Sequence, residues 1–397
     1  MKIYEIGTGY TPIPARISAA TEIVVEELTR AFLKQNIPVE IVDIATESRA
    51  EHKLPIREVK VPGCFSRTDV QLGIMHKLKR VVYSVALAGE LKKILRQTRE
   101  NVVLHFHNQY NLFFFLKLTP ASLRKKAIIA YTNHSGVWRL AWDEIKDAIA
   151  KRYFQEAECM KCADLVFVLN EETKRNVCAH LAVPEKNVVV IGNGVNTDVY
   201  KPLSPEEKEQ VVEKYGFQDR RVILQVGSVY ENKGQLRAVE YMLPLMIKHP
   251  DLVYAYVGGI VDAEYQESII KFAKQNHLEE RIRYLGMVSP GKQLNELYNM
   301  AQTTILPSKY EGFSLASIES CAVGLPVLVD EDGPIKLGFG GIAYNAENFA
   351  EITERLLSEG IFELSVKIRE FAKQTYGWDV IAGEYAEHLL HADGIGN

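Results

Sequence analysis

The sequence predicts an α/β protein of two domains, each built on a doubly wound parallel sheet. Three observations predict this: the chain has 397 residues, short apolar strands alternate with helical segments, and the alternation starts afresh after residue 195. One hydrophobic core seldom serves more than about 250–300 residues, so a chain of this length is expected to divide. Strand–helix–strand repetition implies parallel strands covered by helices on both faces.

The first half shows one strongly periodic helix among its strands. This helix is expected from about Ala19 to Gln35, with one packing face at Ala20, Val24, Leu28 and Ala31. The strands are expected at Lys2–Ile6, Val39–Ile44, Val102–His107, Ala127–Tyr131, Leu165–Leu169 and Val188–Ile191.

A domain boundary is expected at the turn Asn193-Gly194-Val195, so that residues 1–195 form the first domain and residues 196–377 the second. Lys201–Glu207 reads as a linker into a new helix. Because ligands bind at the carboxyl ends of strands in open α/β sheets, the two domains are expected to face each other across a binding cleft. The second set of strands is expected at Val222–Val226, Leu252–Val257, Ile282–Tyr284, Thr304–Leu306 and Pro326–Val329.

Composition and charge indicate a globular chain with a basic first half. Hydrophobic residues make up 47% and charged residues 25%, both ordinary for a globular protein. The net charge of −4 is uneven: residues 1–195 carry +7 and residues 196–397 carry −11. The first half is therefore expected to meet an anionic partner or surface. The N-terminal residues do not read as a signal peptide, and no apolar run approaches the about 20 residues that cross a bilayer, so a cytoplasmic protein is expected.

Five scattered cysteines fit reduced thiols in a reducing compartment. Cys159, Cys162, Cys178 and His180 can be drawn as a zinc site. Cys159 and Cys162 lie on a helical pattern, however, and no second close pair follows. Buried helix thiols are the favoured interpretation, and no metal ligands are expected.

The strongest candidate for chemistry is the segment PSKYEGFSLASIESCAVGLPV, residues 307–327. A strand ends at Leu306, a helix is expected to start near Phe313–Ser314, and its inward face would carry Leu315, Ile318 and Ala322. Backbone N–H groups at a helix start form a site for phosphate oxygens. Glu311 and Glu319 would flank these donors and accept hydrogen bonds from hydroxyl groups. Taken alone, however, their spacing favours two solvated surface glutamates.

This segment resembles the donor-site signature of retaining GT-B glycosyltransferases, most closely glycosyltransferase family 4. The resemblance covers nearly the whole chain and implies two Rossmann-like domains with a C-terminal helix, 378–397, that crosses back to the first. The matching segments are Ala19–Glu22, Asn193–Val195, Gly227–Gly234 (GSVYENKG), the turn at Gly286 in YLGMV, and YGWDVIAGEYAEHL near the C-terminus.

The resemblance also implies roles for individual residues. Glu311 would bind the donor sugar, Glu319 the ribose, and Lys233 would meet the charge that grows on the diphosphate as the anomeric bond breaks. The family usually needs no metal and no cofactor for this step. The other donor-binding positions it implies are Gly227, Ser228, Met287, Val288, Gly312, Phe313, Ser314 and Leu315.

One position departs from the family pattern. The family places an arginine where this chain has Ser228, and a serine can bond a phosphate oxygen but brings no charge. Arg237, in the following helix, is a candidate for compensating. The departure keeps open a non-catalytic homologue that binds nucleotide sugar or serves as a partner subunit of an active transferase.

In the first domain, His134 resembles the family histidine that contacts the donor sugar near the reacting centre. His105 and His107 share one face of the preceding strand and read as packed or cleft-wall residues; a paired-histidine metal site is the lesser option. Gly9 lies in a loop that the family brings near the donor phosphate. Ala20, with the alanine before it, replaces the family's two glycines and restricts backbone approach there.

Residues 76–99 carry seven basic side chains with apolar residues between them. Such a segment can lie on an anionic membrane surface, which would place the protein peripherally on the inner face of the membrane, or it can be an ordinary helix packed on the sheet.

The combined prediction is a glycosyltransferase that moves a sugar from a UDP- or GDP-type donor to an acceptor hydroxyl in cell-surface polysaccharide or glycolipid assembly. The expected partners are the nucleotide sugar and a sugar or lipid-linked acceptor, with no nucleic acid. A sugar-nucleotide epimerase shares the architecture but is not expected to carry the EGF segment with its two glutamates.

Overall fold

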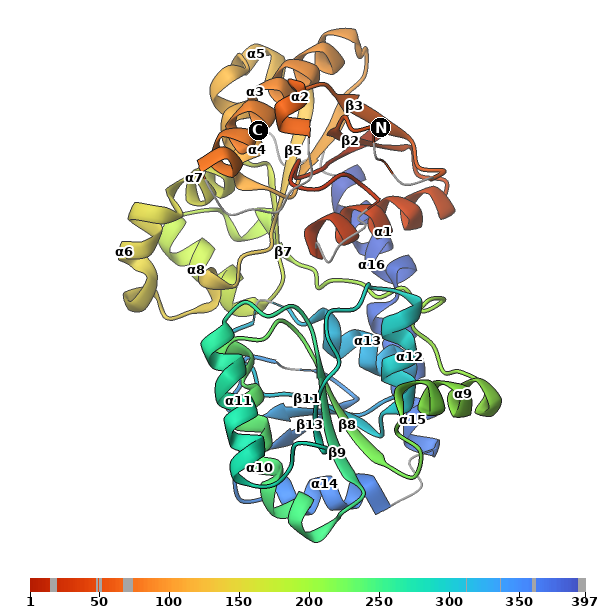
Figure 1. Cartoon of the computed structure of the whole chain (residues 1–397). Coiled ribbons are helices and arrows are strands. Elements are labelled where there is room, and N and C mark those ends of the chain that lie inside the picture. The colour runs from red at the N-terminus through yellow and green to blue at the C-terminus, as the bar shows by residue number, and fades with distance from the viewer. Residues whose placement is uncertain are drawn as a thin grey trace. The chain divides into compact units, whose positions relative to one another are not determined.

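The computed structural model describes residues 1–14, 20–47, 49, 52–66, 74–311, 313–335, 337–358 and 362–391. It divides into two compact units (Figure 1): unit 1 is Met1–Gly194 with Trp378–Asn397, and unit 2 is Val195–Gly377. The division falls within the Asn193-Gly194-Val195 turn. Ala19 and Gly312, both named in the sequence analysis, lie outside the described residues.

Unit 1 contains a parallel sheet in the order β3-β2-β1-β4-β5-β6-β7. The chain order reverses between β1 and β4, and such a switch point opens a crevice at the carboxyl ends of the two strands. Its strands are β1 (Lys2–Ile6), β2 (Val39–Ile44), β3 (Ile56–Val59), β4 (Val102–Phe106), β5 (Ala127–Asn133), β6 (Leu165–Val168) and β7 (Val188–Val190). Its helices are α1 (Ala20–Lys34), α2 (Gly63–Ser66), α3 (Ile74–Gln97), α4 (Gln109–Leu118), α5 (Ala121–Arg124), η1 (Gly136–Arg139), α6 (Trp142–Arg152), α7 (Phe154–Cys162), α8 (Glu171–Leu181), η2 (Glu185–Asn187) and α16 (Trp378–Leu390).

Unit 2 repeats the plan with the order β10-β9-β8-β11-β12-β13, so its switch point lies between β8 and β11. Its strands are β8 (Arg221–Val226), β9 (Leu252–Val257), β10 (Ile282–Tyr284), β11 (Thr303–Leu306), β12 (Val327–Asp330) and β13 (Gly341–Tyr344). Its helices are α9 (Pro205–Tyr215), η3 (Glu231–Lys233), α10 (Gln235–Lys248), α11 (Ala263–Gln275), α12 (Lys292–Met300), α13 (Leu315–Val323), α14 (Phe349–Ser358) and α15 (Phe362–Tyr376).

The two-sheet α/β prediction is confirmed, and every expected strand is present with small shifts at its ends. The sequence analysis missed β3 and β13, which lie at sheet edges and are only half-buried. Edge strands pack against one neighbour, so their hydrophobic signal is weak. In α1 the buried face holds Val24, Leu28 and Ala31, but Ala20 is exposed because it is the first residue of the helix.

Each sheet is covered by helices on both faces. In unit 2, α10, α11 and α14 pack on one face, and α9, α12, α13 and α15 on the other (Figure 1). In unit 1, α16 returns from the end of the chain to pack beside α1, and Gln35 at the end of α1 donates to the Asp379 carbonyl at 2.7 Å. None of the described helices is long and apolar enough to cross a membrane.

The docking of α16 on unit 1 can be tested at Leu389, which is fully buried in the core shared with α1. Replacing Leu389 by Ala removes buried methyl groups and leaves a cavity, so the free energy of unfolding should fall by about 2–5 kcal/mol. Val380→Ala, on the exposed side of the same helix, should change it by less than about 0.5 kcal/mol. Urea denaturation measures both; equal effects would contradict this packing.

Candidate functional site

Three glycine turns line the carboxyl edge of the unit 2 sheet. Gly227, Gly258 and Gly286 follow β8, β9 and β10, and the N–H of Gly258 donates to the Gly286 carbonyl at 2.9 Å. A Cβ on Gly258 would lie 2.1 Å from the Gly227 carbonyl oxygen, so only glycine allows this approach. The turn after Gly286 places Met287 at the surface, 70% exposed, and tucks Val288 partly against the core.

Two buried glutamines hold the loop from Gly227 to Gly234 through hydrogen bonds to its backbone carbonyls. Gln225, on β8, donates to the Lys233 carbonyl at 2.7 Å, and Gln235, on α10, donates to the Ser228 carbonyl at 3.0 Å. Both side chains are fully or almost fully buried. The loop backbone is therefore fixed before any ligand binds.

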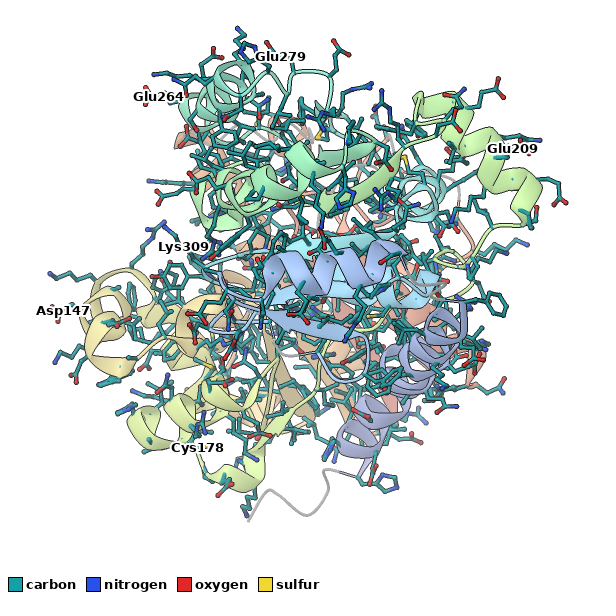
Figure 2. The ribbon with its side chains drawn as sticks, turned by 90° about the horizontal axis from the view of Figure 1, so that it is seen from below. Asp147, Cys178, Glu209, Glu264, Glu279 and Lys309 are labelled. Carbon is teal, nitrogen blue, oxygen red and sulfur yellow. The ribbon has the colours of Figure 1, made fainter. Side chains whose placement is uncertain are left out.

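Asn232 joins this loop to the one that follows β11. Its backbone carbonyl accepts from the Lys309 N–H at 2.9 Å, and its side-chain amide donates to the Tyr310 carbonyl and accepts from the Tyr310 N–H, both at 2.9 Å. Three bonds from one residue hold the two loops together. Lys309 itself (labelled in Figure 2) is exposed and pairs with Glu231 at 2.7 Å.

The junction brings Lys233 and Glu311 into an ion pair. The aliphatic part of Lys233 passes Gly227, where an added Cβ would lie 3.5 Å from it. Both side chains are mostly buried, with 22% and 13% exposed. Two residues that the sequence analysis assigned to one ligand therefore lie together in the structure.

Helix α13 begins at Leu315, a few residues after Glu311. Ser314 is its N-cap and accepts from the Ser317 N–H at 3.3 Å, so the helix starts close to the expected position and leaves Leu315 at its first turn. Phe313 packs edge-on against Tyr376 at 6.3 Å. First-turn N–H groups have no partner inside a helix, and the helix dipole adds positive potential there.

Glu319, further along α13, is held by tyrosines. The Tyr298 hydroxyl donates to its carboxylate at 2.9 Å, and Tyr200 bonds to it as well. Burial raises the pKa of Glu319 despite these hydrogen bonds. Glu319 is therefore a structured carboxylate rather than a solvated surface group.

Arg237 does not take the place of the arginine that is missing at Ser228. Its guanidinium pairs with Asp330 at 3.1 Å and donates to the Pro307 carbonyl. The suggested compensation is therefore not supported, because this cation is already engaged by the ends of β11 and β12.

In unit 1, the carboxyl edge is shaped around Gly9 and α3. A Cβ on Gly9 would lie 2.2 Å from the Tyr83 ring, so the ring requires glycine there. Lys79 is buried and donates to the Tyr10 carbonyl at 3.1 Å, and Arg80 lies over the Tyr10 ring at 4.6 Å. Two of the seven basic residues in segment 76–99 thus pack inward instead of facing solvent.

A buried polar network crosses the same edge. Glu5, on β1, accepts from His105 at 2.9 Å and from His107 at 2.7 Å, and His107 continues to His134 at 3.0 Å. On the other side His105 bonds to Thr132 at 2.7 Å. Glu5 and His105 are fully buried, His107 nearly so, and His134 is half-buried.

The network shifts the pKa values of its members. Burial would raise the pKa of Glu5, but His105, with the hydrogen bonds from both histidines, lowers it to about 2. Burial, followed by the proximity of His105, lowers the pKa of His107 to about 4, although Glu5 opposes this. Burial, followed by the proximity of His107 and His105, lowers the pKa of His134 well below its usual value. Near neutral pH the carboxylate is ionised, and His107 and His134 are neutral.

The sequence analysis missed four residues that build these sites: Glu5, Gln225, Asn232 and Gln235. The first two carried a usable signal, because each is a polar residue inside an otherwise apolar strand (KIYEI and RVILQV). Asn232 and Gln235 carried none, since polar side chains are common in loops and at helix starts.

The cysteines do not show the drawn zinc site. Cys159 is buried on α7 and its thiol donates to the Gln109 carbonyl at 3.2 Å, while Cys162 is exposed. Cys178 lies on the next helix, α8 (Figure 2), and His180 stacks on Trp142 at 4.1 Å. Packing accounts for Cys159, Cys178 and His180, but Cys162 is exposed, so the prediction of buried helix thiols is wrong for this residue.

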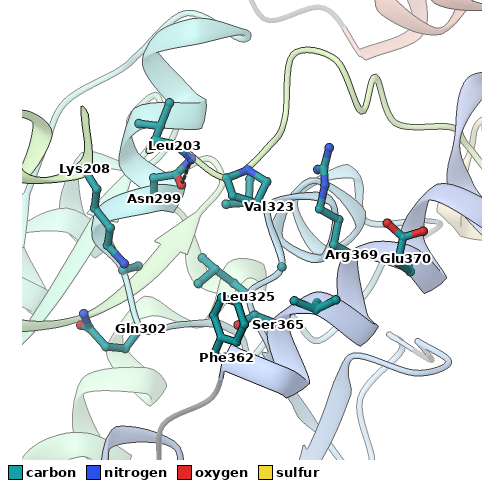
Figure 3. A pocket seen from close by; sticks show the side chains of 14 residues that line it. Leu203, Lys208, Asn299, Gln302, Val323, Leu325, Phe362, Ser365, Arg369 and Glu370 are labelled. Carbon is teal, nitrogen blue, oxygen red and sulfur yellow. Dashed lines mark hydrogen bonds between the residues drawn. The ribbon is translucent and has the colours of Figure 1, made fainter. Parts of the chain in front are cut away.

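A pocket of about 390 Å³ lies elsewhere in unit 2. Gln302 precedes β11 and Leu325 precedes β12, so the pocket opens at the amino ends of these strands (Figure 3). Lys208 and Phe362 complete its rim. It lies at the opposite edge of the sheet from the glycine turns and is not part of the candidate donor site.

Solved structures with this architecture are GT-B proteins. HepE of Anabaena, solved in complex with UDP and glucose, matches with a TM-score of 0.71 over 98% of this chain and 100% of that chain, at 15% identity. Sucrose-phosphate synthase of Thermosynechococcus elongatus matches with a TM-score of 0.73 over 99% of this chain and 100% of that chain, at 18% identity. The protein thus has the GT-B fold.

Family comparisons place the chain within this class. Residues 21–199 match the family described as Glycosyltransferase Family 4, and residues 207–375 match Glycosyl transferases group 1. The chain belongs to the GT-B glycosyltransferases of family 4, as the sequence motifs predicted.

Curated relatives are similar in sequence to this chain over part of their length. An uncharacterized glycosyltransferase of Methanocaldococcus jannaschii is 31% identical over 61% of this chain and 63% of its own length. A D-inositol 3-phosphate glycosyltransferase of Corynebacterium aurimucosum is 25% identical over 55% and 54%. The O-antigen chain mannosyltransferase B of Escherichia coli is 27% identical over 52% and 54%. The matched region thus spans between 54% and 63% of these relatives.

The buried network predicts a pH dependence of stability. His107 has a folded pKa of about 4 against an ordinary 6.5, so between these values the unfolded chain binds more protons. The free energy of unfolding should therefore fall as pH drops from 6.5 to 4, by up to about 1.4 kcal/mol per pH unit from this group. Glu5 does not contribute in this window, because its stabilising effect is lost only below pH 4.5, as pH falls towards about 2.

Urea denaturation from pH 7 to pH 4 measures this slope. His107→Gln keeps a donor for Glu5 and an acceptor for His134 but cannot titrate, so its slope should be shallower than that of the unmodified protein. His391→Gln, at an exposed histidine, should leave the slope unchanged. An unchanged slope in His107→Gln would show that this histidine is not held neutral.

Proposed function

We propose that this protein is a glycosyltransferase that transfers a sugar from a nucleoside diphosphate donor to an acceptor hydroxyl. The observation that carries the proposal is the Lys233–Glu311 pair, held beside Gly227 and followed a few residues later by the start of α13 at Leu315. A cation, a carboxylate and a helix N-terminus in one place match the two ends of a nucleotide sugar, which is anionic at the diphosphate and rich in hydroxyls at the sugar.

In this proposal donor binding separates Lys233 from Glu311, and each then contacts a different part of the donor. Lys233 turns from Glu311 to the diphosphate, and Glu311 accepts hydrogen bonds from sugar hydroxyls. As the anomeric C–O bond breaks, the electron pair stays on the diphosphate, where Lys233 and the first-turn N–H groups of α13, from Leu315 on, meet the growing charge. Hydrogen bonds from Gln225, Gln235 and Asn232 hold the backbone of the two loops, so only the Lys233 side chain has to turn when the donor binds.

Glu319 would bind the ribose of the same donor. Its carboxylate is oriented by Tyr298 and Tyr200, and it projects from the helix whose start takes the phosphate. Met287 and Val288, in the neighbouring turn, would border the base. The positions of Gly9, Ala20, Ser228 and Phe313 remain assigned to substrate binding from the family resemblance.

Retention of anomeric configuration, independence from metal, and a UDP- or GDP-type donor are proposed on the same resemblance. A role in polysaccharide or glycolipid assembly draws support from the Escherichia coli relative that is named an O-antigen chain mannosyltransferase. A non-catalytic nucleotide-sugar-binding homologue is the second candidate, favoured by Ser228 and by the engagement of Arg237 with Asp330.

The donor site can be tested with UDP, GDP, ADP and their common sugar conjugates. A donor that binds only the folded protein should raise its melting temperature, and slow hydrolysis of that donor reports bond cleavage without a known acceptor. Lys233→Ala should lower hydrolysis about 100- to 1,000-fold by removing the cation opposite the leaving group. Lys309→Ala, on the adjoining loop, should change it by less than about threefold, because its ion pair is exposed.

The results separate the candidates. Binding without hydrolysis in the unmodified protein would favour the non-catalytic homologue. Near-full hydrolysis by Lys233→Ala would show that the leaving-group role is wrong.

We also propose that the outer face of α3 contacts an anionic membrane surface. Leu78, Val81 and Val85 form an exposed apolar stripe on it, and Lys77 and Lys93 are exposed on the same helix. An apolar stripe with flanking lysines suits the boundary between headgroups and acyl chains.

Sedimentation with vesicles tests this contact. The protein should bind phosphatidylglycerol-containing vesicles more strongly than phosphatidylcholine vesicles, and Val81→Ser with Val85→Ser should weaken binding several-fold, since each removes apolar surface from the interface. Ile247→Ser, at a residue 71% exposed on α10, is the control and should bind as before. Equal binding by all variants would contradict a role for α3.

A further inference from the structure

The network around Glu5 determines where each proton lies. A carboxylate can only accept hydrogen bonds, so Nε2 of His107 must carry the hydrogen that it donates to Glu5 at 2.7 Å. Because His107 is neutral near pH 7, its Nδ1 then has no hydrogen and must accept. The atom 3.0 Å away is Nε2 of His134, which must therefore be the donor.

His134 is thereby held in one tautomer. Its Nε2–H points at His107, and its Nδ1 keeps a bare lone pair. Among the described residues no hydrogen-bond partner of this Nδ1 is found, and the ring is half-buried at the carboxyl end of β5. The centroids of the two rings lie 5.3 Å apart and their planes differ by 26°, an arrangement that suits an in-line N–H···N hydrogen bond between them.

We propose that Glu5 is a positioning residue that acts through His107 to hold His134 with its Nδ1 lone pair ready to accept a hydrogen bond from a substrate hydroxyl. The hydroxyl is that of a substrate bound at the carboxyl ends of the unit 1 strands, and this part rests on the proposed transferase function. The arrangement of protons rests on the hydrogen-bond geometry and on the neutrality of His107, and it does not depend on the proposed function.

A second branch of the network offers an internal control. Glu5 also accepts from His105, which continues to Thr132 at 2.7 Å and from there to the Tyr385 hydroxyl of α16 at 3.4 Å. This branch leads into the core and away from His134. A change there should leave the His134 tautomer as it is.

A metal ion at Glu5, His105 and His107, whose ligand atoms lie close enough together to hold one, would reverse the result. Nε2 of His107 would then bind the metal through its lone pair, so its hydrogen would sit on Nδ1. His134 would have to accept at Nε2 and carry its hydrogen on Nδ1. The His134 tautomer therefore discriminates between the hydrogen-bonded network and a metal centre.

The first experiment is ¹⁵N NMR of the histidine rings in the full chain, with metal content measured on the same sample. His134→Ala assigns the His134 signals by their loss. We expect the Nε2–H tautomer of His134 near pH 7. The Nδ1–H tautomer, or a cationic ring, would overturn the proposal.

The second experiment uses Glu5→Gln, which offers one acceptor and one donor where the carboxylate offers two acceptors. One of the two histidines must then give up its N–H toward position 5: the His105 signals change if it is His105, and the His134 signals move to the Nδ1–H form if it is His107. Thr132→Val, on the other branch, should leave the His134 signals unchanged. Unaltered tautomers of both His105 and His134 in Glu5→Gln would overturn the role of the carboxylate. The wild-type spectrum decides the question on its own if Glu5→Gln does not fold.

A double-mutant cycle on donor hydrolysis separates positioning from a general structural role. Glu5→Gln alone should lower hydrolysis about 10- to 100-fold, the range seen when an orienting partner of a functional histidine is removed. In a His134→Ala background the same change should cost nothing further. Equal losses in both backgrounds would show that Glu5 serves the fold instead. If the unmodified protein hydrolyses no donor, the proposed function fails, while the tautomer measurement still decides the network.

Discussion

The parallel pairing of β8 with β11 is the constraint on which the donor site depends. These strands lie about 80 residues apart in the chain, yet Ile223 pairs with Thr303 and their carboxyl ends open at the same edge. The following loops then meet so closely that a Cβ on Gly234 would lie 2.6 Å from the Pro307 carbonyl oxygen. Asn232 completes the junction with three hydrogen bonds. Lys233 and Glu311 are adjacent because these contacts hold the two loops against each other.

In unit 1 a buried network that includes a charged carboxylate lies at the switch point of the sheet. At its switch point Glu5 and His105 are direct partners in the register of β1 and β4, and His105 in turn faces Ala130 of β5. The strands are otherwise apolar here, so the carboxylate, the imidazoles and Thr132 satisfy one another. In unit 2 the corresponding position of β8 holds the neutral Gln225, which bonds to the loop backbone and to Tyr254. Both sheets thus use buried polar groups at the switch point; at this position the group is ionised in unit 1 and neutral in unit 2.

Most of the fold and part of the site were predictable from the sequence. Strands such as Leu252–Val257 are apolar along their whole length because both faces of the sheet are covered, so the local sequence is enough to predict them. Glu311 and Glu319 were found because their spacing fits a known motif. The partners that orient them were not, since Tyr298 lies on a different helix and Asn232 on a different loop, and no local pattern records which distant elements a sheet brings together. The inward direction of Lys79 and Arg80 was not predicted for the same reason: it depends on Tyr10, which lies far away in the chain.

Stability alone does not explain Glu5. Taking a carboxylate out of water costs several kcal/mol, and well-packed apolar residues in place of a buried ionic group are often as stable or more stable. The surrounding core of apolar strands would accept such a residue, as it does at Ile3 and Ile6 on the same strand. What an apolar side chain cannot do is accept two hydrogen bonds and so decide which nitrogen of each imidazole carries the hydrogen. Through the hydrogen bonds from His107 to Glu5 and from His134 to His107, the carboxylate determines the tautomer of His134. This histidine lies at the carboxyl edge of the sheet, where substrates of α/β proteins bind. Because the buried Glu5 carboxylate is costly for folding, its presence is better explained by its effect on His134 than by a contribution to the stability of the core.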